Sequence, residues 1–147
     1  MSDVFNSGPL APRAGTANVA SLEGNPTLRL AVIAARAAEE RKGADVTLLE
    51  VTEVSYLADY FVLVSGFSAV QVRAIARSVE EALETECNRR PLRTEGLLEG
   101  SWVLQDFGEV IVHIFLPDER EFYNLEAFWG HAHKLDYEAL AARLEVL

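Results

Sequence analysis

The sequence predicts an α+β (α/β) domain in which one mixed β-sheet is flanked by helices. The order of hydrophobic patterns is helix, two strands, helix, two or three strands, then helices. Two of the strand patterns, residues 60–65 and 109–116, are apolar on both faces, as is typical of internal strands covered on both sides. Half of the 147 residues are hydrophobic, which is enough for one sizeable core.

Residues 1–24 are predicted to form a flexible N-terminal tail, and residues 25–147 a single domain with a C-terminal helical extension. The tail is rich in Ala, Gly, Pro, Ser and Asn and has little apolar periodicity. An organelle transit peptide is the alternative interpretation. Transit peptides are rich in basic residues. The tail does not fit this pattern, because Arg13 is its only basic residue while Asp3 and Glu23 are acidic.

The domain is predicted to begin with a helix at Asn25 and Pro26, since Asn caps free N–H groups and Pro suits the first helical position. Gly43 is expected to end this helix in the left-handed conformation. Residues 46–54 and 60–65 follow as strands.

A second helix is expected to open with the capping-box pattern of Ser68 and Gln71. Its apolar residues recur at helical spacing: Val72, Ile75, Ala76, Val79 and Leu83. Residues 91–95 are read as a short strand.

Residues 102–107 and 109–116 are predicted to form a β-hairpin, which Pro117 ends because proline cannot donate to the ladder. A charged loop and a short amphipathic helix ending on Trp129 should follow. The buried face of that helix is predicted to hold Phe122, Leu125 and Trp129. A last helix, capped by Asp136, should bury Tyr137, Leu140, Ala141 and Leu144.

The charge pattern predicts a basic protein as the partner. The formal net charge is −10, which disfavours binding to phosphate backbones, so no direct sequence-specific contact with nucleic acid is expected. Cys87 is the only cysteine, which fits a reducing compartment. The sequence shows no apolar run long enough to span a membrane and no secretory signal pattern.

Large aromatic residues within an acidic segment predict a docking face after residue 101. Aromatic and arginine anchors with a charged rim are the usual anatomy of protein interfaces. The candidate partner-binding residues are Trp102, Asp106, Glu109, Glu119, Arg120, Tyr123, Glu126 and Trp129. Two alternatives stay open: both tryptophans could be core residues, and Glu119 or Glu126 could hold Arg120 in place of a partner.

Enzymatic chemistry has little support in the sequence. The turn at Gly66 to Ser68 lies before a helix and could bind phosphate, as in a nucleotidyl-transferring enzyme. Such an enzyme also needs paired strand carboxylates for magnesium. Between Ser68 and Asp118 the only two carboxylates separated by a single residue are Glu84 and Glu86, on a predicted helix, and Asp106 and Glu109 bracket a tight turn, which is a worse geometry. We therefore expect no catalytic residue and no cofactor.

The histidines and the cysteine predict no metal or thiol site. His131 and His133 lack a nearby third ligand, and their spacing would point them apart on a helix. His113 is expected to be a core or dimer-face residue with a satisfied hydrogen bond. Cys87 follows a glutamate-rich helix, which disfavours a reactive thiolate.

A set of motifs resembles the ribosomal silencing factor family, also called the Iojap family. The matching motifs are 59–63 (DYFVL) with Gly66 and Ser68; 72–76 (VRAIA); Glu95 and Gly96; Trp102, Asp106 and Gly108; Val112 and His113; and Arg120, Tyr123, Leu125, Glu126 and Trp129. The resemblance covers about residues 28–129. Residues 67–70 (FSAV) replace a stretch that is often basic in the family, and the segment beyond Trp129 matches no motif.

The resemblance implies a nucleotidyltransferase-like topology without catalytic carboxylates. It also implies a translational repressor that is homodimeric when free. Such a protein would bind the large ribosomal subunit through ribosomal protein L-fourteen and block joining of the small subunit when nutrients are scarce. The expected location is cytoplasmic, or the stroma or matrix of an organelle. A nucleotide-binding enzyme and a generic dimeric adaptor remain the alternatives. On this reading, Asp106→Arg should abolish co-sedimentation with large subunits.

Overall fold

The structure, a computed structural model, describes residues 22–146. The predicted tail therefore falls outside the described residues, except for its last three. Leu22–Gly24 form the 3-10 helix η1, and the Leu22 side chain is fully buried in the core. Leu22 packs with the helices α2 (Pro26–Glu40) and α6 (Tyr137–Val146), so these three residues belong to the folded core rather than to a tail.

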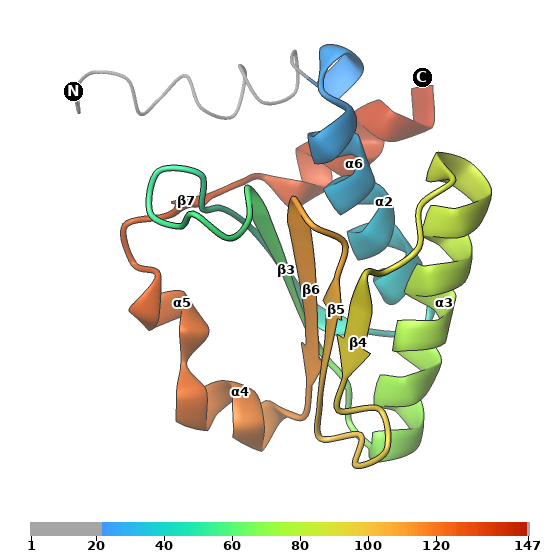
Figure 1. Cartoon of the computed structure of the whole chain (residues 1–147), viewed down its shortest axis with the longest axis vertical. Coiled ribbons are helices and arrows are strands. Elements are labelled where there is room, and N and C mark those ends of the chain that lie inside the picture. Colours follow the sequence, from blue (N-terminus) through green and yellow to red (C-terminus); the bar gives the residue numbers. More distant parts are fainter. Residues whose placement is uncertain (1–21, 147) are drawn as a thin grey trace.

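One six-stranded mixed sheet forms the centre of the molecule, in the order β4-β5-β6-β3-β2-β7 (Figure 1). The strands are β2 (Ala44–Glu50), β3 (Tyr60–Ser65), β4 (Arg93–Glu95), β5 (Trp102–Asp106), β6 (Val110–Phe115) and β7 (His133–Lys134). The central pair, β3 and β6, is parallel, and the other pairs are antiparallel. Every residue of β3 is buried, as the two-sided apolar pattern predicted.

Helices cover the two faces of the sheet unequally. The long helices α2 (Pro26–Glu40) and α3 (Ala69–Cys87) and the C-terminal helix α6 (Tyr137–Val146) pack on one face with the main core. The opposite face carries a smaller cluster around Phe61, Leu63 and Phe115. Among the helices of residues 22–146, only the short α4 (Pro117–Tyr123) and α5 (Leu125–Phe128) lie over it (Figure 1). The predicted helices on both faces are confirmed, and the second face is thinly covered.

The predicted helix starts are confirmed by their hydrogen bonds. Asn25 Oδ1 accepts from the Leu28 N–H at 3.0 Å, and Ser68 Oγ accepts from the Gln71 N–H at 3.1 Å. Gln71 Oε1 accepts from the Phe67 N–H at 2.8 Å, one residue before the position expected in a capping box.

The end of α2 and the limits of β2 differ from the prediction. Lys42, with φ of +68°, takes the left-handed conformation that was expected at Gly43. Gly43 is required by crowding, since a Cβ there would lie 2.6 Å from Val64 Cγ1. Strand β2 ends at Glu50 rather than residue 54, because the chain turns after Val51, whose N–H bonds the Asp59 carbonyl oxygen.

The predicted hairpin of β5 and β6 is confirmed, and the short strand before it is present as β4. Gly96, which precedes the hairpin, has φ of +88°, and a Cβ there would lie 2.0 Å from the Trp102 carbonyl oxygen. Only glycine fits this close backbone approach.

The segment after the hairpin is helical where a charged loop was predicted. Pro117 occupies the first turn of α4, followed by Asp118 and Glu119, and all three favour a helix N-terminus. Asn124, with φ of +46°, then separates α4 from α5. The predicted single apolar face is therefore wrong: Phe122 is 80% exposed, whereas Leu125 and Trp129 pack on the sheet.

Candidate partner-binding site

An aromatic cluster occupies the thinly covered face of the sheet. The Trp102 ring lies with its centroid 4.8 Å from that of Tyr123 and 5.4 Å from that of Phe115. Phe61 contacts Trp129 edge-on, with centroids 5.4 Å apart. Trp102 and Trp129 are half-buried, so both lie between the core and the surface. Strand β5, helix α4 and the segment after α5 thus present one aromatic surface.

His113 lies beneath this cluster and is almost fully buried. Its Nδ1 accepts a hydrogen bond from Trp102 Nε1 at 3.2 Å, which fixes the neutral ring with its proton on Nε2. Nε2 has no hydrogen-bond partner within the described part of the chain. The predicted core position is confirmed, but the hydrogen bonding is satisfied on one nitrogen alone. Burial lowers the pKa of His113 from 6.5 to about 4.

The buried His113 should make the protein less stable in acid. In the unfolded chain the imidazole binds a proton near pH 6.5, whereas in the fold it does so only near pH 4. Its contribution to the free energy of unfolding is therefore present above pH 6.5, and about 3 kcal/mol is lost as the pH falls to 4. Urea unfolding of the natural protein and His113→Gln between pH 4 and 7 measures this. Equal pH slopes for the two proteins would contradict the assignment.

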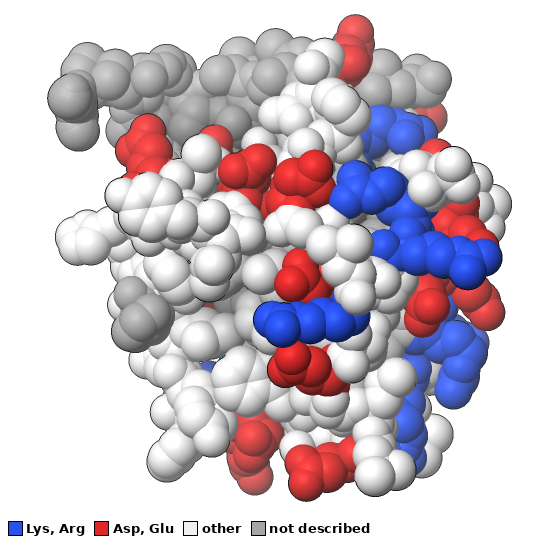
Figure 2. All heavy atoms as spheres, in the orientation of Figure 1, with Lys and Arg blue, Asp and Glu red and all other residues white. Residues whose placement is uncertain are grey.

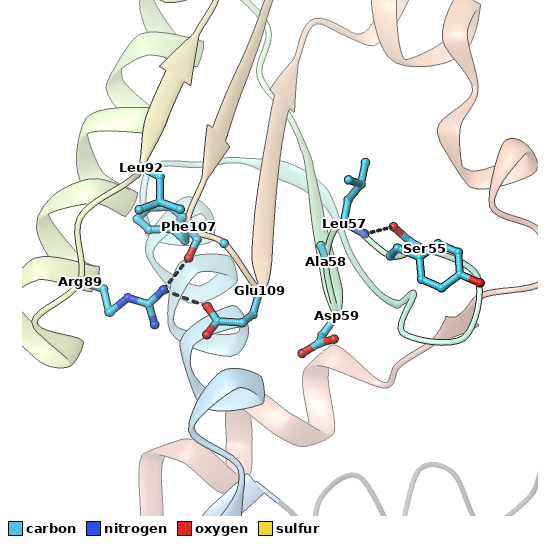
Figure 3. A pocket seen from close by; sticks show the side chains of 10 residues that line it. Ser55, Leu57, Ala58, Asp59, Arg89, Leu92, Phe107 and Glu109 are labelled. Atoms are coloured by element: carbon cyan, nitrogen blue, oxygen red, sulfur yellow. Dashed lines mark hydrogen bonds and ion pairs between the residues drawn. The ribbon is translucent and has the colours of Figure 1, made fainter.

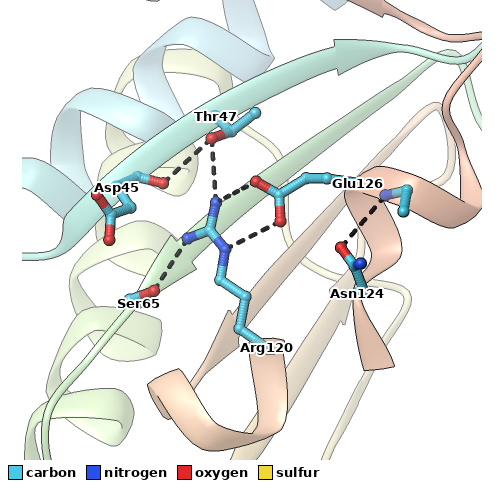
Figure 4. Close-up of polar contacts among 7 residues, drawn as sticks. Asp45, Thr47, Ser65, Arg120, Asn124 and Glu126 are labelled. Carbon is cyan, nitrogen blue, oxygen red and sulfur yellow. Dashed lines mark hydrogen bonds and ion pairs between the residues drawn. The ribbon is translucent and has the colours of Figure 1, made fainter. Parts of the chain in front are cut away.

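Arg120 forms an internal clamp that joins α4 and α5 to the sheet (Figure 4). Its Nη1 donates to Ser65 Oγ and its Nη2 to Thr47 Oγ1, both at 3.0 Å. Nη2 also lies 2.9 Å from Glu126 Oε2, and Nε lies 3.3 Å from Oε1. The guanidinium carbon sits 5.7 Å from the centre of the Phe115 ring. Of the two alternatives for Arg120, retention by Glu126 is the one observed.

The structure divides the eight candidate residues into two groups. Trp102, Glu119, Arg120, Tyr123, Glu126 and Trp129 belong to the aromatic face and to helices α4 and α5. Asp106 and Glu109 lie beside the β5–β6 turn instead. Asp106 Oδ1 accepts from the Gly108 N–H at 2.8 Å, and Glu109 is ion-paired with Arg89 at 2.9 Å. The Arg89 hydrogen bond also lowers the pKa of Glu109.

A set of exposed apolar residues lies near α4, and of these only Tyr123 was predicted from the sequence as a partner-binding residue. They lie at the end of the sheet where α3 begins, in the loop before β5 and on α4 (Figure 1). We call these residues the apolar end patch: Phe67, Val70, Leu97, Leu98, Phe122 and Tyr123. Leu98 is 94% and Phe122 80% exposed. Phe67, next to Gly66 and just before a capped helix, was the one sequence signal that could have revealed the patch.

The turn at Gly66 is a poor phosphate-binding site, because several of its backbone N–H groups are already hydrogen-bonded within the fold. The Gly66 N–H donates to the Phe115 carbonyl oxygen at 3.0 Å, and the Phe67 and Gln71 N–H groups are bonded to side chains. A Cβ at Gly66 would lie 2.9 Å from Val72 Cγ2. This glycine therefore allows close packing of β3 against α3, and its N–H serves the sheet.

Residues 22–146 contain no group of three or more potential metal-ligating side chains. His131 lies in a turn and His133 in β7, rather than on a helix as considered from the sequence. Burial raises the pKa of the Cys87 thiol. No helix in this part of the chain is long and apolar enough to cross a membrane.

These features define a small acidic α+β domain with a mixed sheet and an aromatic face. The chain belongs to the ribosomal silencing factor family, because the family model described as "Ribosomal silencing factor during starvation" matches residues 25–145. That match extends past Trp129 and includes the C-terminal helix, which the sequence motifs had left unassigned.

Named relatives agree with this assignment. The chain is 41% identical over 106 residues to the ribosomal silencing factor of Bacillus subtilis, covering 72% of this chain and 89% of the relative. It is 39% identical over 105 residues to the chloroplastic Iojap protein of Zea mays, covering 71% of this chain and 45% of that protein.

Solved structures show the same fold. A crystal structure from Chromobacterium violaceum is 36% identical, with a TM-score of 0.68, and the match covers 71% of this chain and 86% of that one. A crystal structure from Bacillus halodurans is 38% identical, with a TM-score of 0.59, over 69% of this chain and 91% of that one.

Proposed function

We propose that this protein silences translation by binding the large ribosomal subunit through ribosomal protein L-fourteen and blocking the small subunit. Family membership supports the ribosomal role, since the relatives are named as silencing factors rather than as enzymes. One structural observation carries the binding mode: the apolar end patch adjoins the aromatic face, where the Phe122 and Tyr123 rings lie 5.0 Å apart.

The apolar end patch has an acidic rim. Asp118, Glu119 and Glu121 lie on α4, Glu95 ends β4, and Glu99 lies in the loop before β5. Figure 2 shows acidic side chains at this lower end beside uncharged residues, whereas many of the visible basic side chains lie along the α3 side. Exposed aromatic anchors with an acidic rim suit a basic protein surface. With a net charge of −10, a phosphate backbone would be repelled.

The structure changes which charge reversal best tests this proposal. Asp106 holds the turn at Gly108 and lies 3.6 Å from Arg93, so Asp106→Arg would disturb the hairpin as well as the surface charge. Glu121 is exposed on α4, so Glu121→Arg alters the rim alone.

Sedimentation with purified large subunits tests the proposal. The protein should travel with the large subunit, and small subunits added afterwards should fail to form whole ribosomes. Glu121→Arg should weaken this binding most strongly at low salt, because screening reduces rim electrostatics. If the natural protein stays at the top of the gradient while subunits join normally, the proposed mechanism is wrong.

We also propose that the free protein is a homodimer. It would act in the compartment that contains the ribosomes it binds. For a bacterial cell this is the cytoplasm, and the chloroplastic names of some relatives point to the stroma in plants.

A further inference from the structure

The loop that joins β4 to β5 carries the most exposed residue of the apolar end patch. Residues 96–100, with the sequence GLLEG, lie beside the start of α3 (Figure 1). Leu98 is 94% exposed, so the folded chain gains almost nothing from its apolar surface. Single exposed leucines are common on protein surfaces, but the backbone that presents Leu98 is tightly constrained.

Two glycines and one hydrogen bond close this loop into a turn. Gly96 and Gly100 have φ of +88° and +71°, in the left-handed region that favours glycine. The Gly100 N–H donates to the Gly96 carbonyl oxygen at 2.9 Å, which brings the two ends of the loop together. Gly100 is buried, and a Cβ there would lie 2.8 Å from Ala69 Cβ. The end of the loop therefore packs closely against the start of α3.

Arg73 ties the tip of the loop to α3. Its Nη1 donates to the carbonyl oxygens of Leu98, at 3.3 Å, and Leu97, at 3.5 Å. Beyond the loop, the Ser101 carbonyl oxygen accepts from the Leu116 N–H at 3.0 Å, just before α4 begins. The loop is thus fixed between α3 and α4, the two helices that carry other residues of the apolar end patch.

We propose that residues 96–100 are a preformed anchor, in which Leu98 enters an apolar pocket on a basic protein and Arg73 is the positioning residue. This inference rests on the proposed function, which supplies the basic partner. A side chain on a fixed loop loses little conformational entropy on binding, and the Leu98 surface leaves water only in the complex. Leu98 therefore contributes more to affinity than a mobile leucine of equal exposure.

Charge and position define the surface that Leu98 would meet. Glu99 is exposed and directly follows Leu98, so a pocket that receives the leucine must accept a carboxylate at its rim. Val70 on α3 and Phe122 on α4 continue the apolar surface on either side of the loop. A protein pocket with an apolar floor and a basic rim satisfies both conditions. A phosphate-bearing surface would be repelled by Glu99 and by the net charge of −10.

Co-sedimentation of Leu98→Ala with purified large subunits tests the anchor. Its affinity should fall at least about tenfold, while the midpoint of urea unfolding stays unchanged because the side chain is exposed. Leu92→Ala is the matched control and should bind as the natural protein does. Leu92 is 74% exposed, but it lines a surface cavity of about 510 Å³ at the other end of the sheet (Figure 3).

Amide hydrogen exchange tests the role of Arg73 without any partner. In Arg73→Met the Gly100 amide should exchange at least about tenfold faster, because the tip of the loop is released from α3. The matched control is Arg77→Met, which changes an exposed arginine one turn further along α3 and should leave this exchange rate unchanged. Unchanged amide shifts in β6 verify that both variants are folded. A Gly100 amide that exchanges equally slowly in both variants would show that Arg73 does not fix the loop.

A double variant separates positioning from direct contact. Arg73→Met alone should weaken binding to the large subunit, and adding Arg73→Met to Leu98→Ala should cause little further loss, because Arg73 acts through the loop. Losses that multiply would mean that Arg73 contacts the partner itself, which would overturn its positioning role.

Failure of the anchor can be told apart from failure of the proposed function. If the natural protein binds the large subunit and Leu98→Ala binds equally well, the anchor alone is overturned. If Leu98→Ala instead turns a dimer into a monomer while large-subunit binding is unchanged, the loop contacts a second copy of this chain, which also overturns the inference. If the natural protein does not bind the large subunit, the proposed function and this partner fail together.

Discussion

Replacing Arg120 with methionine should lower the free energy of unfolding by about 3 kcal/mol. The change keeps much of the apolar volume but removes donors to Ser65 and Thr47 and the ion pair with Glu126. The two hydroxyl groups are buried, so losing their partner is costly. Urea or thermal unfolding at neutral pH measures the loss.

Arg90→Met is the matched control for this measurement. Arg90 is also ion-paired, to Glu84 at 2.6 Å, but its side chain is 75% exposed, so water replaces the lost contact. The Arg90→Met change should lower the free energy of unfolding by at most about 0.5 kcal/mol. Equal and small losses in both variants would mean that Arg120 is held weakly and is free to reach a partner.

Replacing Phe122 with alanine should weaken binding to the large subunit by about 30-fold, or about 2 kcal/mol, without changing stability. Phe122 is 80% exposed, so the folded monomer gains little from its ring. In a docked complex the same ring would be removed from water by the partner. Co-sedimentation over a range of protein concentrations gives the affinity.

Leu92→Ala is the control for the binding measurement. Leu92 is similarly exposed, at 74%, but lies at the other end of the sheet. The affinity of the Leu92→Ala protein for large subunits should remain within about twofold of that of the natural protein, as for most residues outside an interface hot spot. A Phe122→Ala protein that binds as tightly as Leu92→Ala would place the ribosome contact on another surface.

Local patterns were sufficient to predict most of the fold. Asn25 and Ser68 act on residues within one turn of themselves, so their effects can be read directly from the sequence. The two-sided apolar pattern of β3 likewise identified a central strand. The strand pairing across the hairpin followed from its turn.

The functional residues were harder to predict from the sequence, because their environment depends on long-range contacts. Arg120 is retained by Ser65 and Thr47, which are 55 and 73 positions away, and no local pattern reveals such partners. The contact of Arg73 with the loop at Leu98 spans 25 positions in the same way. Phe122 was placed on a buried face because a single helix was assumed, whereas the left-handed Asn124 turns the chain between α4 and α5.

The parallel pairing of β3 and β6 has a consequence for synthesis of the protein. Tyr60 pairs with Val110, which follows it by 50 positions. At ordinary elongation rates that interval lasts about 3 to 10 s. During this time β2 can protect one edge of β3, but the other edge of this largely apolar strand has no partner. The nascent chain is thus most prone to aggregation between the emergence of β3 and that of β6, and holding by a chaperone would matter most in this interval.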